Sequence, residues 1–423
     1  MLAPAEPALA TTFVGNCADS GVGTLRAAVA GAGEFGTVDM TSLNCGRITL
    51  HTGITVPWQN LKIAGPGAGK LIIDTKYQFR VFEHPGTGTF EVDDVTISGG
   101  YVQDVTAKGG CIFSEGTVSL LRSTVSECKA VGIYAFGGAI FANQVILTSS
   151  QLLSNTVTAI GGGIAAASGG GAFAASATTL NNAVVSGNSA IPGANGSAGG
   201  LDAGGSTSIA YSTLSGNYAS GGGGAVVAWD SSSAPGGSFL LMRNSTVSGN
   251  SSGTTVGGIS SRVPTTLEYI TVAFNTANAG SSGGTYHAPG VDIRQGGAPT
   301  ATISGILLSN NTYGPTATEN DLSSAVTLAK GVPNFVRAST SSLPSGTLLG
   351  VCPHLGPLRD NGGPTATHAL LSGSQAINKI ALTPDAHVSA DQRNAARDGV
   401  RDMGAYEVQH GDIVFDDGFD GCG

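Results

Sequence analysis

The chain has 423 residues, of which 66 are glycine, 11% are charged and only 6% are aromatic, and its formal net charge is −9. The glycines follow no three-residue period, which excludes a collagen triple helix, and an apolar fraction of 41% excludes a disordered chain. Nucleic-acid binding needs a basic stripe and a membrane span needs about 18 consecutive apolar residues, so neither is predicted here.

The N-terminal segment, residues 1–10, lacks the basic region and apolar core of a complete export signal, but it ends in Ala-Leu-Ala, a form typical of signal-peptidase sites. We therefore expect the remnant of an export signal, and a flexible Ala/Pro leader is the alternative. Residues 23–29 follow, and Thr24 is expected to open a short helix with one apolar face. This helix is predicted to cap irregular first coils within residues 11–110.

The chain contains six cysteines, an even number that favours an oxidising compartment. Their spacing is not that of a zinc finger, so disulfides are the better interpretation. Sequence separation favours one of fifteen possible connectivities. The predicted pairs are Cys17 with Cys45, Cys111 with Cys128, and Cys352 with Cys422.

The middle of the chain repeats two short signals at spacings of roughly 25 to 36 residues. One is Ser-Gly-Asn after Val or Leu, with looser copies on either side, and the other is a Gly-Gly pair that leads into small apolar residues. This spacing is typical of one coil of a solenoid. Residues 111–316 are therefore predicted to form the regular coils of one elongated all-β domain.

The asparagine that ends each copy of the first signal tolerates a left-handed backbone, and its amide can hydrogen-bond along a stack. We expect these residues to form an asparagine ladder with a purely structural role, made of Asn155, Asn188, Asn217, Asn250, Asn275 and Asn311. The residues before them should form an internal aliphatic column of Leu152, Val185, Leu214, Val247, Val272 and Leu308.

The Gly-Gly pairs are expected to form a second corner with positive φ, after which a strand begins. Counting alternation from each pair gives the inward residues Ala139, Ile164, Leu201, Ala225 and Ile259. It gives the outward residues Ile140, Ala165, Asp202, Val226 and Ser260. That outer face is unusually small and apolar, so loops or a binding partner are expected to cover it.

Two parts of the sequence resemble known families. CADSGVGTLRAAVAGA and the strands after it resemble exported bacterial right-handed parallel β-helix proteins, and the repeats are similar to those of polymorphic outer-membrane proteins. LGPLRDNGGPTATHALLSGSQAIN and DQRNAARDGVRDMGAYE resemble the choice-of-anchor module that closes β-helix surface proteins. The resemblance implies a single-stranded right-handed parallel β-helix that is secreted or held at the outer cell surface, with no known reaction.

On the basis of this resemblance, the C-terminal part of the chain is divided into two segments. Residues 317–407 are expected to hold the last coils and the anchor-like module, fixed by pairing among Asp391, Arg393, Arg397 and Glu407. Residues 408–423 form an acidic tail. Its Asp416, Asp417 and Asp420 could bind calcium, and a solvated tail tied down by Cys422 is the alternative. No other cofactor is expected.

Parallel β-helices also carry polysaccharide-active enzymes of the pectate-lyase-like kind, so the few charged residues of the repeats are candidates for catalysis. Uronate lyase chemistry needs a cation and a base, and hydrolysis needs two carboxyl groups. The candidates on the outer face are Asp202, Asp230 and Arg262, with Trp229, Tyr286 and His287 as candidate ligand-binding residues.

These observations favour a non-catalytic exported protein in adhesion, or in contact with extracellular polysaccharide or with glycans of a host or cell surface. The alternative is a polysaccharide lyase or glycoside hydrolase that acts on a polymer bound along the β-helix. A third hypothesis is a homotrimer that associates through the flat apolar face, in place of a monomer.

Overall fold

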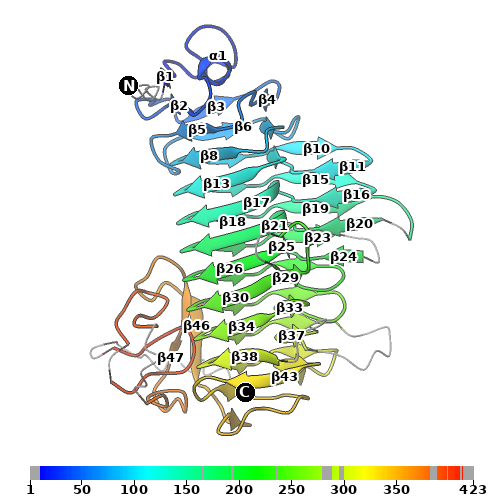
Figure 1. Ribbon diagram of the computed structural model, residues 1–423, viewed down its shortest axis with the longest axis vertical. Coiled ribbons are helices and arrows are strands. Elements are labelled where there is room, and N and C mark those ends of the chain that lie inside the picture. The colour runs from blue at the N-terminus through cyan, green and yellow to red at the C-terminus, as the bar shows by residue number, and fades with distance from the viewer. Residues whose placement is uncertain are drawn as a thin grey trace, which may run out of the picture.

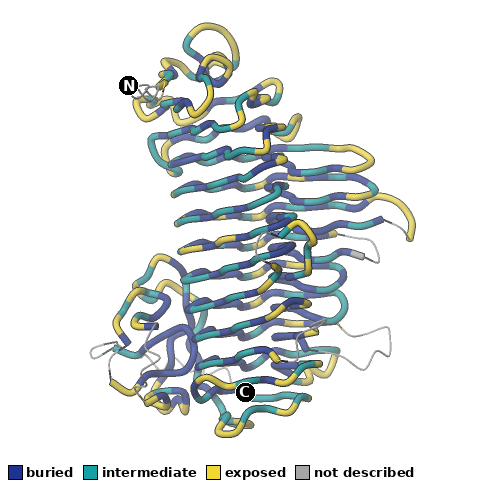
Figure 2. Tube along the Cα trace, viewed as in Figure 1, coloured by how far each residue is buried: buried dark blue, intermediate teal, exposed yellow. Residues whose placement is uncertain are grey.

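A computed structural model describes residues 10–163, 165–191, 195–234, 237–278, 288–294, 300–381, 388–397, 399–409 and 412. The chain winds into a column of stacked coils whose strands pair in parallel with those of the coils above and below (Figure 1). The inner faces of the coils are buried along the whole column (Figure 2). The fold is therefore an all-β, single-stranded parallel β-helix, as predicted.

The largest sheet, which we call sheet A, has twenty strands, and most coils contribute two of them. The strands are β1 Thr11–Phe13, β2 Gly36–Asp39, β4 Ile54–Thr55, β5 Leu61–Ala64, β7 Phe82–His84, β8 Thr89–Asp93, β12 Ile112–Ser114, β13 Thr117–Leu121, β17 Ile140–Thr148, β21 Ala172–Asn181, β25 Leu201–Gly204, β26 Ser206–Ala210, β29 Val226–Trp229, β30 Phe239–Arg243, β33 Ile259–Ser261, β34 Thr265–Glu268, β37 Val291–Ile293, β38 Thr300–Ser304, β42 Leu322–Ser324 and β43 Thr327–Lys330.

Sheet B has twelve strands and carries the aliphatic column. The strands are β3 Arg47–Thr49, β6 Ile72–Asp74, β9 Thr96–Ser98, β14 Thr124–Ser126, β18 Gln151–Leu153, β22 Val184–Ser186, β27 Thr213–Ser215, β31 Thr246–Ser248, β35 Thr271–Ala273, β39 Leu307–Ser309, β44 Phe335–Val336 and β45 Leu348–Leu349. Their central residues stack in register and are fully buried, which confirms the predicted column from Leu152 to Leu308.

Sheet C has nine strands, and its last pair is antiparallel. The strands are β10 Tyr101–Gln103, β15 Lys129–Gly132, β19 Thr156–Ala159, β23 Ser189–Ile191, β28 Tyr218–Ala219, β32 Ser251–Ser252, β36 Thr276–Ala277, β40 Thr312–Tyr313 and β41 Thr318–Glu319. Four of the coils extend beyond it into sheet D, made of β11 Thr106–Lys108, β16 Tyr134–Phe136, β20 Ala166–Ser168 and β24 Asn195–Ser197.

The strands from β10 to β24 in sheets C and D project from the side of the column, and we call this projection the fin (Figure 1). A small core built mostly of alanines fills the space between its two sheets. Small side chains allow the two sheets to approach closely, which explains the alanine-rich sequence of these coils.

The asparagines before sheet C form a continuous buried ladder. In each step the amide nitrogen of one asparagine donates to the side-chain oxygen of the next, at 2.8 to 2.9 Å. The members are Asn155, Asn188, Asn217, Asn250, Asn275 and Asn311, and Asp321 accepts from the last of them. The amide nitrogens also donate to backbone carbonyl oxygens of neighbouring coils. The ladder therefore supplies hydrogen-bond partners for buried backbone groups at the bend of each coil.

The register after the Gly-Gly corner differs from the prediction at Ile140 and Val226. Both were expected to face outward, yet both are fully buried and align with the inward residues Leu201 and Ile259. The corner contains three residues, such as 137–139, and a two-residue count therefore misplaces the strand by one position.

The pair Gly162 and Gly163 is not a corner, because it lies in an exposed loop of the fin. The equivalent corner is Gly169 to Gly171, whose first residue has a φ of 70°. Ala165 was expected to face outward, but it is buried in the alanine core of the fin. Ile164 lies outside the described residues.

The N-terminal helix α1, Leu25–Gly31, has the predicted cap, because the Thr24 side chain accepts from the Ala27 backbone N–H at 3.3 Å. Two predicted disulfides, Cys17–Cys45 and Cys111–Cys128, are confirmed. Cys352 is also disulfide-bonded, and Cys422 lies outside the described residues.

The C-terminal segment after the last coil packs on the outer face of sheet B (Figure 1). It contains the antiparallel pair β46 Leu355–Arg359 and β47 Thr367–Leu370. Its contacts with the column include a 2.8 Å hydrogen bond between His368 and Ser248 and a 2.7 Å hydrogen bond from Thr246 to Gln392. A second hydrophobic cluster fills the interface.

Candidate functional site

The predicted polar site around Asp202 lies on the outer face of sheet A, in register with Phe173, but Asp202 itself is covered. Trp229 Nε1 and the Ser168 hydroxyl each donate to one carboxylate oxygen, and only 7% of Asp202 is exposed. Burial raises the pKa of Asp202 to about 6, against the opposing effects of Ser168, Trp229 and Arg262. Asp202 therefore joins the fin to the column and holds Trp229 in place.

Of the other members of the predicted catalytic set, Arg262 is near enough to act electrostatically on Asp202 but forms neither of the two hydrogen bonds that cover its carboxylate. Asp230 and Arg262 are exposed and directly follow the ends of β29 and β33. Trp229 crosses Gly204 on the neighbouring strand, where an added Cβ would lie 2.7 Å from the indole ring. A glycine at this position lets the indole reach Asp202, so Trp229 has a packing role.

Other candidate residues lie outside the described part of the chain. These are Tyr286, His287 and the tail residues Asp416, Asp417 and Asp420. Within the described ranges, no group of three or more His, Cys, Asp and Glu side chains is placed to hold a metal ion. Calcium binding by the tail stays a prediction.

The raised pKa of Asp202 predicts a specific pH dependence of stability. Because the folded state binds the proton more tightly than the unfolded chain, the stability that the neutral carboxyl provides is lost as pH rises from about 4 to about 6. In Asp202→Asn the side chain stays neutral, so the wild type should lose about 3 kcal/mol relative to this variant over that window. Urea unfolding at pH 4 and pH 7 measures the difference, and equal pH profiles of the two proteins would contradict the assignment.

Beside Asp202, three phenylalanines at the outward position of successive coils form an aromatic stack. The ring centroids of Phe113 and Phe141 are 5.8 Å apart, and those of Phe141 and Phe173 are 5.1 Å apart with nearly parallel planes. Trp229 continues the stack beyond Phe173, and the fin residue Phe136 packs against the Phe173 edge. Lys108 of the fin lies over the Phe141 ring at 4.6 Å, so the stack lies on the outer face of sheet A where the fin meets it.

A pocket of about 460 Å³ opens at the N-terminal end of this stack, at the base of the fin. We call it the fin-base pocket, and its lining residues are Gly53, Ile54, Thr55, Gln78, Phe79, Arg80, Glu83, Tyr101, Val102 and Gln103. It combines two aromatic side chains, two amides and one ion pair. This combination of apolar surface and a few convergent polar groups is typical of small-ligand sites.

Three successive parts of the chain build the fin-base pocket. The loop that contains Gly53 is fixed by Arg26 of α1, which donates to the carbonyl oxygens of Thr52 and Gly53 at 2.7 Å. The Thr75 hydroxyl donates to the Phe79 carbonyl oxygen at 2.5 Å and shapes the second segment. The first fin strand β10 supplies the third part of the lining, with Tyr101, Val102 and Gln103.

The second segment carries backbone strain next to the pocket. Lys76 and Tyr77 are consecutive non-glycine residues in the left-handed region, with φ of 50° and 60°. Such conformations cost about 1–3 kcal/mol each and cluster at functional sites. Tyr77 is 45% exposed, and Lys129 of the fin lies 5.3 Å from its ring centroid. Positive φ also occurs at bends of other coils, for example at Asp94 and Arg122, so this backbone conformation shapes the segment without marking the pocket as a site.

The polar groups of the pocket are oriented by their neighbours. Arg80 donates to the carbonyl oxygens of Lys108 and Gly109 at 2.8 and 2.9 Å and lies over the Phe113 ring, so its guanidinium is fixed. Its Nη1 lies 3.6 Å from Glu83 Oε2, and half of the Glu83 side chain is exposed. Such a pair presents both a donor and an acceptor to a ligand.

None of the fin-base pocket residues was among the candidates from the sequence. The segment KYQFRVFEH, residues 76–84, gathers three aromatic and three charged residues in a chain that is poor in both. That density is the signal that could have identified it. The phenylalanine stack also has a signal, the motif Gly-Gly-x-x-Phe at residues 109–113, 137–141 and 169–173.

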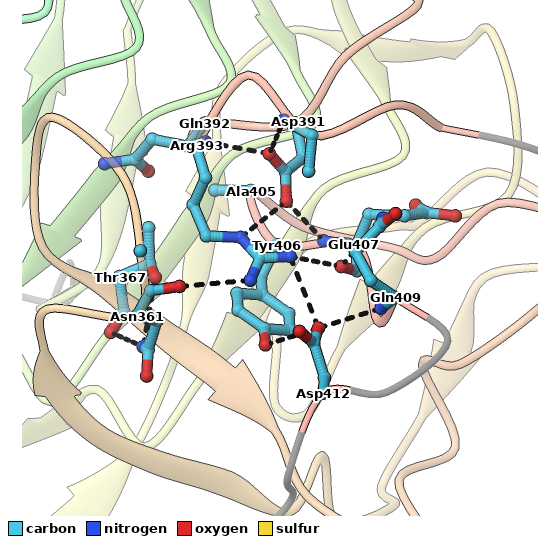
Figure 3. Close-up of polar contacts among 12 residues, drawn as sticks. Asn361, Thr367, Asp391, Gln392, Arg393, Ala405, Tyr406, Glu407, Gln409 and Asp412 are labelled. Carbon is cyan, nitrogen blue, oxygen red and sulfur yellow. Dashed lines mark hydrogen bonds and ion pairs between the residues drawn. The ribbon is translucent and has the colours of Figure 1, made fainter.

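The C-terminal module is held together by a buried charge network (Figure 3). Arg393 pairs with Asp391 at 2.9 Å and lies over the Tyr406 ring at 3.8 Å. Arg397, whose side chain has no exposed surface, pairs with Glu407 at 2.8 Å. These contacts confirm the pairing expected for the module, and Arg397 also contacts Asn244 and Tyr269 of the column.

The only helix among the described residues, α1, is seven residues long, so none there is long and apolar enough to cross a membrane. Comparisons of the chain with protein-family models, curated proteins and solved structures find no match. The functional interpretation therefore depends on the geometry of the site itself.

Proposed function

We propose that this protein is an exported, non-catalytic β-helix that binds glycans of an extracellular matrix or cell surface through the fin-base pocket. The observation that carries the proposal is the juxtaposition of Phe79, Tyr101 and the Arg80–Glu83 pair in one pocket. Aromatic surface contacts the apolar C–H groups of a sugar ring, and the polar groups exchange hydrogen bonds with its hydroxyls.

Two further observations support an exported protein. Disulfides persist in oxidising compartments, and the cysteines of the first coils and of the fin are paired. The resemblance of the C-terminal module to choice-of-anchor modules, and of the repeats to polymorphic outer-membrane proteins, favours a place at the outer cell surface. A monomer and a homotrimer are both compatible with the proposal, and light scattering distinguishes them.

A polysaccharide lyase or glycoside hydrolase is the second candidate function, and the raised pKa of Asp202 favours it. Against it, both oxygens of Asp202 are engaged by Ser168 and Trp229, which leaves the carboxylate covered. Incubation with uronic-acid polymers, followed by absorbance of new unsaturated ends and by a reducing-end assay, tests this candidate. Product formation that Asp202→Asn abolishes would replace the binding proposal with an enzymatic one.

A glycan array with the purified chain tests the binding proposal. Phe79→Leu keeps an apolar side chain but removes the aromatic face, so the affinity for the best glycan should fall about tenfold. Phe239→Leu is the matched control, because Phe239 is 38% exposed against 39% for Phe79 and does not line the pocket. Titration calorimetry of both variants measures the effect, and equal losses in the two variants would argue against the pocket.

A further inference from the structure

We infer that the fin-base pocket selects a neutral sugar with adjacent hydroxyl groups over its acidic, uronate counterpart. This inference rests on the proposed glycan binding and adds the chemical class of the ligand. The enzymatic alternative would require an acidic, uronate-containing polymer, whereas this inference predicts a neutral ligand.

The charged side chains in the pocket lining indicate that an acidic sugar would bind poorly. Arg80 and Glu83 are the charged residues among its lining, and they lie within ion-pair distance of each other at 3.6 Å. The Arg80 guanidinium also donates to two backbone carbonyl oxygens, from Nε to Gly109 at 2.9 Å and from Nη2 to Lys108 at 2.8 Å. Glu83 offsets the charge of Arg80, so the lining of the pocket has no net positive charge, and a sugar carboxylate placed beside Glu83 would be repelled by it.

The acceptor side of the pocket fits hydroxyl groups. Glu83 has two carboxylate oxygens that can accept from two neighbouring hydroxyls, and its 50% side-chain exposure leaves it accessible. Its backbone is fixed by parallel pairing, with Thr55 on the coil before and Phe113 on the coil after. Glu83 thus extends from a strand, so its backbone position relative to the other lining residues is fixed.

The donor and apolar sides complete the match. The Tyr101 hydroxyl donates to Gln103 Oε1 at 2.6 Å, which turns the amide nitrogen of Gln103 into the available donor of that side chain. Phe79 is 39% exposed and supplies apolar surface for the C–H face of a ring. Acceptor, donor and aromatic face together complement an uncharged polyhydroxyl ring.

Titration calorimetry with matched probes tests the inference. Methyl glucoside, galactoside and mannoside are compared with methyl glucuronide, galacturonide and mannuronide on the full chain. We expect at least one neutral probe to bind at least about tenfold more tightly than its acidic counterpart. In Glu83→Gln, affinity for that neutral probe should fall about tenfold while affinity for the acidic probe does not fall, so the preference for the neutral probe should shrink by at least about tenfold.

Glu115→Gln is the matched control, since Glu115 is an exposed glutamate of the next coil and does not line the pocket. It should bind both probes like the wild type, and thermal unfolding shows that each variant is folded. Equal or tighter binding of the acidic probes by the wild type overturns the inference while glycan binding stands. Failure of every neutral and acidic probe to bind overturns the proposed function together with it.

Discussion

Replacing Asn217 with alanine is expected to lower the free energy of unfolding by about 3–5 kcal/mol, because several buried hydrogen-bonding groups lose their partner at once. The Asn217 amide donates to the Val185 carbonyl oxygen at 2.9 Å and to Asn250 at 2.8 Å, and its oxygen accepts twice from Asn188. Asn217 is fully buried, so water cannot replace these bonds. Urea unfolding followed by circular dichroism measures the change.

Asn181→Ala is the control for this experiment, since Asn181 is an exposed asparagine at the end of β21 and is not a member of the ladder. Its substitution should change stability by no more than about 0.5 kcal/mol. If Asn217→Ala were as stable as this control, the ladder would not contribute to the stability of the stacked coils.

Replacing Arg397 with methionine is expected to undock the C-terminal module from sheet B. The substitution leaves Glu407 buried without its cation and removes the bonds of Arg397 to Asn244 and to the Gly404 carbonyl oxygen. Breaking a buried pair from one side costs about 3–5 kcal/mol. Limited proteolysis should then cleave the module much faster than in the wild type, while the column stays resistant.

The effect should depend on pH. Burial raises the pKa of Glu407 to about 7 even beside Arg397, so the ionised form is already disfavoured in the folded state. Without the guanidinium the pKa of Glu407 rises further, and the free energy needed to keep the carboxyl neutral in the folded state grows as pH rises, so the destabilisation should be larger at pH 8 than at pH 5. Arg359→Met, at an exposed arginine of the same module, should leave the cleavage rate unchanged. Equal cleavage of both variants at pH 8 would show that Arg397 does not hold the module.

The stacked coils could be predicted from the sequence because each coil repeats the same residues at the same bend. Val185, Leu214 and Val247 follow a two-residue alternation before an asparagine, and identical local geometry then places them in register. The capping helix was equally local, since Thr24 and the apolar face that follows it lie within two turns.

The outer face could not be predicted with the same rule. At the second corner Ala139 replaces a glycine, so the corner of three residues looks like a corner of two, and Ile140 was assigned to the wrong face. A shift of one residue reverses every side chain of a strand. The wrong register at Ile140 places Phe141 on the inner face, and for this reason the phenylalanine stack on the outer face was not predicted.

The fin-base pocket was missed for a different reason. Its residues come from the irregular first coils, where no repeat signals which side chains meet. Gly53, Glu83 and Tyr101 lie on three successive parts of the chain and converge only because β4, β7 and β10 are placed by the stacking of the coils. The outward position of Asp202 was predicted from the sequence. Its burial was not, because it depends on Trp229 of the next coil, which crosses Gly204 to reach the carboxylate.

The position of a bound sugar tests the central claim most directly. A crystal structure of the chain with the glycan that binds best on the array should show a sugar ring against Phe79 and Tyr101, with hydroxyl groups within hydrogen-bond distance of Glu83. A sugar bound instead beside Asp202 and Trp229, or at any other surface of the column with the fin-base pocket empty, would contradict the account.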